Sequence, residues 1–156
     1  MIDQADKNGP GVKFPPPLIT LALIFIGWLL DQLLALPIAE QTAVAGAILL
    51  LASAAFIASI TAFQFFQAKT HIEPWKPTST IITRGVYRYS RNPIYLAFCI
   101  ATPGAGMLLN SWWVIAMVLP LIYLLQRLVI SREEKYLEQK FGQEYLAYRD
   151  SVRRWI

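Results

Sequence analysis

Long hydrophobic stretches make up most of the chain, and short polar segments separate them. Residues 18–36 form a first stretch in which Asp31 is the one charge, and residues 42–66 form a second without any charge. Crossing the hydrocarbon core of a bilayer takes about 20 apolar residues in a helix. Each of the two stretches therefore predicts a transmembrane helix, and Pro37 marks the end of the first.

A third uncharged stretch runs from residue 92 to residue 126. A single helix of that length would measure roughly 50 Å, which is too long for one crossing. Asn110-Ser111 offers a turn in the middle. We therefore expect a tight helical hairpin with transmembrane helices at 94–109 and 112–130.

The remaining segments are polar. Residues 1–17 end in three prolines and are predicted to form a surface tail. Residues 67–93 combine basic residues with prolines, and residues 131–156 begin with an amphipathic helix. The expected fold is therefore an all-α, integral membrane domain of residues 1–156, with four transmembrane helices and a cytosolic C-terminal helix. Residues 67–93 and 131–156 are the expected cytosolic segments.

Composition supports a lipid environment. Hydrophobic residues make up 56% of the 156 residues and charged residues only 15%, against about 45–50% and 25% in soluble domains. Cys99 is the only cysteine and His71 the only histidine, so neither a disulfide framework nor a protein metal site is expected.

The basic residues follow the positive-inside rule. Of the 14 lysines and arginines, two precede the first helix, five lie between the second and third, and seven follow Gln126. This distribution places both termini and the 67–91 loop on the cytoplasmic side, at the inner or plasma membrane if the protein is bacterial. Membrane lipids are the expected partners of these charges, and nucleic acid is not needed to explain them.

A polar site has to come from the two cytosolic segments. A hairpin would bring Arg91-Asn92, before the third helix, close to Glu133-Glu134, beyond the fourth. A solvated ion-pair network is the alternative explanation for these charges. Phosphate loops, zinc-protease motifs and a Ser-His-Asp set are missing from the sequence, and Gly104-Ala105-Gly106 does not follow a strand. An acidic pair, an amide and tyrosine hydroxyls would suit a cationic cofactor.

Four ordered blocks resemble the superfamily of isoprenylcysteine carboxyl methyltransferases and phospholipid methyltransferases. They are STIITRGVY at 79–87, RNPIY at 91–95, EEKYL at 133–137 and FGQEYLAY at 141–148. The resemblance covers roughly residues 67–156. It implies a methyltransferase that uses S-adenosyl-L-methionine and acts on a lipophilic small molecule.

The resemblance also implies a cofactor pocket at the cytosolic face. Its cofactor-binding residues would be Ser79, Thr80, Ile81, Ile82, Tyr87, Asn92, Pro93, Ile94, Tyr95, Glu133 and Glu134. Arg91, Tyr95 and Arg132 are the candidate catalytic residues.

Three positions depart from the family pattern. Asn92 and Ser79 stand where the family has histidines, and Val129 stands where the prenylcysteine enzymes carry an arginine that holds the substrate carboxylate. Arg132 lies three residues further on and is a candidate substitute. We therefore do not expect a prenylcysteine carboxylate as the substrate.

Two other functions remain open at this point. Sterol reductases have a related C-terminal half, so a nicotinamide-dependent membrane reductase is one alternative. A non-catalytic scaffold or transporter subunit is the other. The sequence indicates neither the methyl acceptor nor the oligomeric state.

Overall fold

The computed structural model describes residues 9–38 and 40–156, and regular structure in these residues is helical. The helices are α2 (Pro16–Leu33), α3 (Glu40–Gln67), α4 (Pro93–Leu108), α5 (Trp112–Ala116), α6 (Val118–Leu125), α7 (Ser131–Phe141) and α8 (Gln143–Ser151). A short 3₁₀ helix, η1 (Gly85–Arg88), interrupts the loop between α3 and α4, and a π-helical turn, η2 (Gln126–Ile130), joins α6 to α7. The predicted all-α fold is confirmed.

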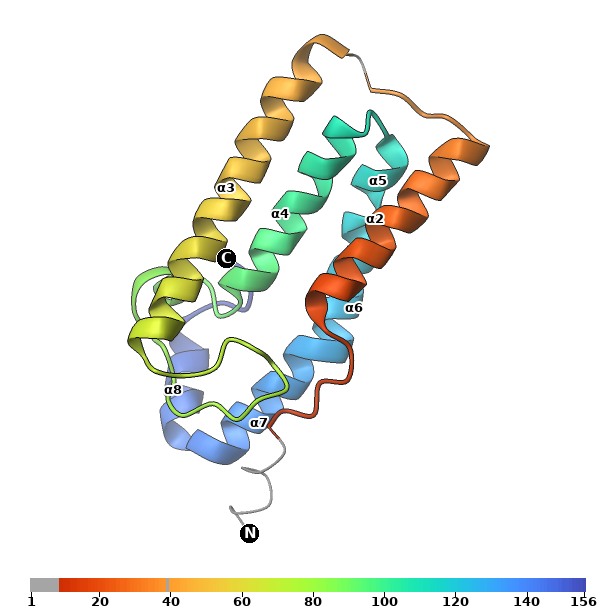
Figure 1. Ribbon diagram of the computed structural model, residues 1–156. Helices are drawn as coiled ribbons and strands as arrows, with labels where there is room; N and C mark the ends of the chain where they lie inside the picture. The colour runs from red at the N-terminus through yellow and green to blue at the C-terminus, as the bar shows by residue number, and fades with distance from the viewer. Residues whose placement is uncertain (1–8, 39) are drawn as a thin grey trace.

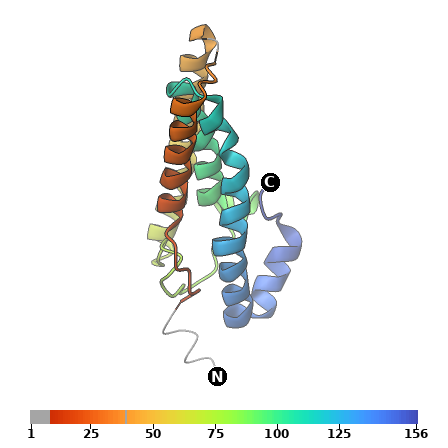
Figure 2. The same ribbon diagram turned by 90° about the vertical axis from the view of Figure 1, so that its right-hand side faces the viewer.

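The long helices run side by side along one direction. In Figure 1, α3 descends, α4 ascends beside it, and α5 and α6 descend; α2 ascends in front of α5 and α6, on the side away from α3. The most extensive packing is that of α3 on α4, followed by that of α5 on both α2 and α4. The long loop 68–92 and helices α7 and α8 gather at one end of the bundle, where Figure 2 shows the last two helices projecting to one side.

Within the part of the chain that the structure describes, three helices are long and apolar enough to cross a membrane, namely Pro16–Leu33, Ala43–Gln67 and Trp112–Phe141. Their outer surfaces expose large apolar side chains such as Phe25, Leu49 and Leu119. A surface of this kind is unstable in water but suits lipid. Helix α4 is apolar but has 16 residues, so the structure by itself supports three membrane-capable helices.

The N-terminal part differs from the prediction in two ways. Helix α2 begins at Pro16, because a proline is compatible with the first helical turn, and it ends at Leu33 instead of residue 36. Residues 1–8 of the predicted surface tail lie outside the described residues. In the part that is described, Val12 is buried in the core, so the tail is not wholly a surface segment.

The predicted boundary at residue 130 is not a helix end. The helix continues through the π-helical turn into α7, where the chain becomes charged after Ile130. Gly142, with a φ of 54°, then separates α7 from α8. Glycine adopts this backbone conformation readily, so the C-terminal segment folds as two helices instead of one.

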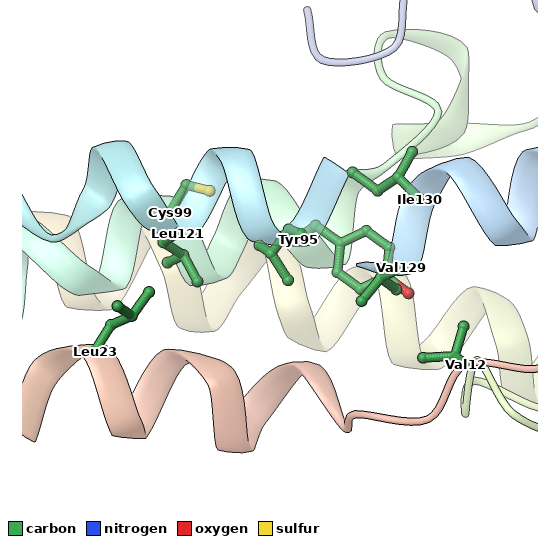
Figure 3. Packing of buried hydrophobic residues seen from close by; sticks show 8 residues of the cluster. Val12, Leu23, Tyr95, Cys99, Leu121, Val129 and Ile130 are labelled. Atoms are coloured by element: carbon green, nitrogen blue, oxygen red, sulfur yellow. The ribbon is translucent and has the colours of Figure 1, made fainter. Parts of the chain in front are cut away.

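A buried apolar cluster joins the bundle to its charged end. It contains Val12, Leu23, Tyr95, Cys99, Leu121, Leu125, Val129 and Ile130. Figure 3 shows the Tyr95 side chain reaching from α4 towards Val129 on the neighbouring helix, with Val12 close to them. The cluster fixes the first turn of α4 against the helix that leads into α7.

Candidate functional site

A cavity of about 760 Å³, including the space at its mouth, opens at the charged end of the bundle. Its walls come from the end of α3, the 68–92 loop, the start of α4, and helices α7 and α8. They are lined by Phe65, His71, Ile72, Glu73, Pro74, Thr78, Thr80, Ile81, Ile82, Tyr87, Arg91, Asn92, Ile94, Tyr95, Glu133, Glu134, Leu137, Tyr145 and Tyr148. The two segments predicted to meet therefore share one cavity.

Ten of the predicted site residues line this cavity. They are Thr80, Ile81, Ile82, Tyr87, Arg91, Asn92, Ile94, Tyr95, Glu133 and Glu134. The other three lie elsewhere. Pro93 is buried at the start of α4, and Ser79 is exposed and hydrogen-bonds within the loop, to Thr70 and Lys69. Arg132 is exposed and donates to the carbonyl oxygen of Gly11 at 2.8 Å, so its position does not support the predicted catalytic role.

Tyr95 and Glu133 form a pair in the cavity wall. The Tyr95 hydroxyl is hydrogen-bonded to the Glu133 carboxylate, although the two residues come from different helices. Glu133 lies beyond the apolar run that ends at Ile130. Burial raises its pKa to about 8, and the neighbouring Glu134 charge adds to this effect. A positively charged ligand beside Glu133 would favour its ionised form.

Arg91 and Glu134 form a buried ion pair next to this site. The Arg91 Nη2 to Glu134 Oε1 distance is 2.9 Å, and the two side chains are only 8% and 14% exposed. Arg91 Nη1 also donates to the carbonyl oxygen of Arg149 at 2.9 Å, whereas Arg91 Nε is buried without a partner. The predicted network of arginines and acids therefore exists, but at this point it is buried and built into the cavity wall.

Three tyrosines form another part of the cavity wall. Tyr87, Tyr145 and Tyr148 pack together, and the Tyr148 hydroxyl donates to the carbonyl oxygen of Tyr87 at 2.7 Å. Burial raises the pKa of Tyr87 well above its usual range and that of Tyr145 to about 12. These phenols are therefore neutral near pH 7. Tyr145 and Tyr148, both on α8, also line the cavity.

Part of the cavity wall, in the long loop, was not predicted from the sequence. His71, Ile72 and Glu73 line the cavity. Glu73 bonds to Lys76 Nζ at 2.6 Å and lies 3.9 Å from His71 Nδ1. No periodic pattern marks these residues. The single histidine of the chain, two residues before a glutamate, was nevertheless a signal that could have indicated a site. Within residues 9–38 and 40–156, no three His, Cys, Asp or Glu side chains come together as a metal site.

Comparison with known proteins adds two findings. Part of the chain is 49% identical over 39 residues to an uncharacterized protein of Haemophilus influenzae. This match covers 25% of the chain and 62% of that protein, which carries no functional name. The second finding is a match of residues 41–144 to the model of the phospholipid methyltransferase family.

The family match includes more of the chain than the four sequence blocks did. It begins at the start of α3, whereas the resemblance was expected from residue 67, and it ends at Glu144 in α8. It contains Arg91-Asn92, Tyr95 and the Glu133-Glu134 pair, and it supports neither the reductase nor the scaffold alternative. Because the match covers more than half of the chain, the chain belongs to the phospholipid methyltransferase family, a family of membrane methyltransferases.

Proposed function

We propose that this protein transfers a methyl group from S-adenosyl-L-methionine to a lipophilic or membrane-associated small substrate other than a prenylcysteine carboxylate. One observation carries the proposal. The RNPIY segment and the Glu133-Glu134 pair, far apart in the chain, line one cavity at the charged end of an apolar helical bundle.

The chemistry of the cavity fits this cofactor. Glu133 and Glu73 supply negative charge for a sulfonium and an ammonium group, and neutral tyrosine hydroxyls and the Asn92 region supply polar groups. Ile81 and Ile82 add apolar wall beside them. The pocket thus combines few charged groups with a mostly apolar lining, as cofactor sites do.

When bound, the cofactor would supply a methyl group activated on a sulfonium. Transfer from a sulfonium would disperse positive charge, so a dry and well-aligned pocket would supply much of the rate. Leu137, Ile94 and Phe65 exclude water from the cavity wall, and the Tyr95–Glu133 hydrogen bond fixes the acid.

The basic residues argue against a carboxylate substrate. Among the described residues that line the cavity, Arg91 is the only lysine or arginine. Its two terminal nitrogens already bind Glu134 and a backbone carbonyl. Val129, at the position where the prenylcysteine enzymes carry arginine, is fully buried. A substrate carboxylate would therefore find no available cation here.

The topology is also part of the proposal. We place four crossings in the membrane, with the shorter α4 as one of them, and both termini and the cavity on the cytoplasmic side. The distribution of lysine and arginine supports this orientation. A lipophilic acceptor would then reach the cavity from the inner leaflet.

Calorimetry on the detergent-purified protein tests the function. We expect S-adenosylmethionine and S-adenosylhomocysteine to bind in the micromolar range, about −8 kcal/mol. Glu133→Ala should largely abolish binding. Glu138→Gln is the matched control, since Glu138 lies on the same helix but outside the cavity lining. Failure of the wild-type protein to bind either compound, or equal binding by Glu133→Ala, would refute the proposal.

A further inference from the structure

The last five residues, 152–156, lie against the start of α4. Helix α8 ends at Ser151, and the chain continues in an extended conformation at Val152. The backbone N–H of Arg91 donates to the carbonyl oxygen of Arg153 at 3.1 Å, and Asn92 Nδ2 donates to that of Arg154 at 2.9 Å. Figure 2 shows this segment turning back from α8 towards the bundle. We call residues 152–156 the C-terminal strap.

The strap also reaches the acidic pair through one side chain. Arg154 Nε donates to Glu134 Oε1 at 3.0 Å, and Arg154 Nη2 donates to Glu134 Oε2 at 2.6 Å. A guanidinium that engages both carboxylate oxygens fixes the orientation of the carboxylate as well as its charge. Glu134 is therefore held from two sides, by Arg91 and by Arg154.

Arg91 and Arg154 contact the Glu134 carboxylate in different ways. Arg91 contacts Oε1 of Glu134, whereas Arg154 contacts both carboxylate oxygens, Oε1 through Nε and Oε2 through Nη2. Without Arg154, rotation of the carboxylate would disturb its single bond to Arg91. Arg91 is only 8% exposed, and its two terminal nitrogens already bind Glu134 and the Arg149 carbonyl oxygen, so it has little capacity to compensate.

We propose that Arg154 is a positioning residue of the cofactor site. It holds Glu134, and through Glu134 the Arg91-Asn92 segment, in the geometry that binds the cofactor. This inference rests on the proposed function. The strap lies beyond residues 41–144, so the family match does not contain Arg154.

The positive charge of Arg154 and its positioning of Glu134 should have opposite effects on the affinity for the cofactor, so the inference can be tested. Replacing Arg154 by a neutral residue makes the cavity more negative, and attraction alone would then strengthen the binding of a cationic cofactor. Loss of the held geometry weakens binding instead. The direction of the change in affinity therefore separates a positioning role from a purely electrostatic one.

The experiment measures S-adenosylmethionine and S-adenosylhomocysteine binding by calorimetry for the wild type, Arg154→Gln, Arg154→Lys and Arg153→Gln. We expect Arg154→Gln to weaken both affinities about tenfold, the scale of a lost charge-assisted fork. Arg154→Lys keeps the charge but not the two-point contact, so its affinity should be intermediate. Arg153→Gln removes the same charge from an exposed neighbouring side chain and should bind like the wild type.

A double-mutant cycle tests whether Arg154 acts through Glu134. If it does, Glu134→Gln with Arg154→Gln should bind no more weakly than Glu134→Gln alone, a coupling that general loss of structure would not give. Additive losses would overturn the inference, as would unchanged or tighter binding by Arg154→Gln. If Arg154→Gln does not fold, wild-type affinity of Arg154→Lys would overturn it. Absence of binding by the wild type would instead refute the proposed function.

Discussion

If the proposed cofactor binds beside Glu133, its affinity should depend on pH in a direction that follows from the pKa of this carboxyl group. Burial raises its pKa to about 8, with Tyr95 bonded to it and Glu134 beside it. A raised pKa means that the neutral acid predominates below pH 8. A cationic cofactor favours the carboxylate, so the apparent affinity should fall as the pH is lowered below 8 and level off above it.

The size of this effect follows from the ionised fraction. With a pKa of about 8, about 9% of the protein carries the carboxylate at pH 7, about 50% at pH 8 and about 91% at pH 9. If the carboxylate form binds much more tightly than the neutral form, the apparent affinity should rise by up to about tenfold from pH 7 to pH 9. Binding at pH 7 should release about 0.9 protons per site.

Calorimetry at pH 6 to 9, in buffers of different ionisation enthalpy, measures both the apparent affinity and the number of protons released on binding. The cofactor's own α-amino group also titrates near pH 8. Glu133→Gln therefore supplies the baseline, because its binding should depend on pH through this amino group and not through the side chain at position 133. Glu138→Gln should keep the wild-type profile. A wild-type profile that coincides with that of Glu133→Gln would show that this carboxyl group does not control binding.

Three further changes have defined outcomes. Tyr95→Phe removes a bond that lowers the pKa of Glu133, so the pH midpoint of binding should rise, and an unchanged midpoint in calorimetry would contradict this. Asp31→Ala should lower stability in thermal unfolding by about 1 kcal/mol and leave cofactor binding unchanged, because its bonds lie at the opposite end of the bundle. Gly27→Ala should cost about 1–3 kcal/mol, since the new Cβ would lie 2.8 Å from backbone, whereas Gly46→Ala meets a flexible methionine at 3.2 Å and should cost less.

The helices could be predicted because lipid imposes a simple rule on the sequence. Uncharged runs had to be helical, since the hydrocarbon core offers no partner for free backbone groups. Their ends were less predictable. Asp31 accepts a bond from the N–H of Leu36 and another from the Ser111 hydroxyl, at 3.3 and 2.9 Å, across the loop that follows α2. Such contacts between distant segments leave no periodic signal in the chain.

The site could be predicted as far as it depends on the helical hairpin in which α5 and α6 run antiparallel to α4. That path brings the start of α4 to α7, so Tyr95 and Glu133 meet as expected. The loop residues from His71 to Pro74 and the strap residue Arg154 were not found. Their positions depend on the irregular paths of two non-helical segments, which are set by individual bonds such as that from Thr78 N to the Tyr136 hydroxyl.

Arg132 shows why spacing alone was insufficient near the acidic pair. The expectation that it replaces the arginine missing at Val129 assumed a regular α-helix, in which residues three apart share a face. The π-helical turn Gln126–Ile130 has more residues per turn and changes this register just before Arg132. Val129 therefore stays fully buried in the cluster with Tyr95 and Val12, while Arg132 binds the backbone of Gly11. An apolar contact thus replaces a cation beside Tyr95, which is the environment expected for a lipophilic acceptor without a carboxylate.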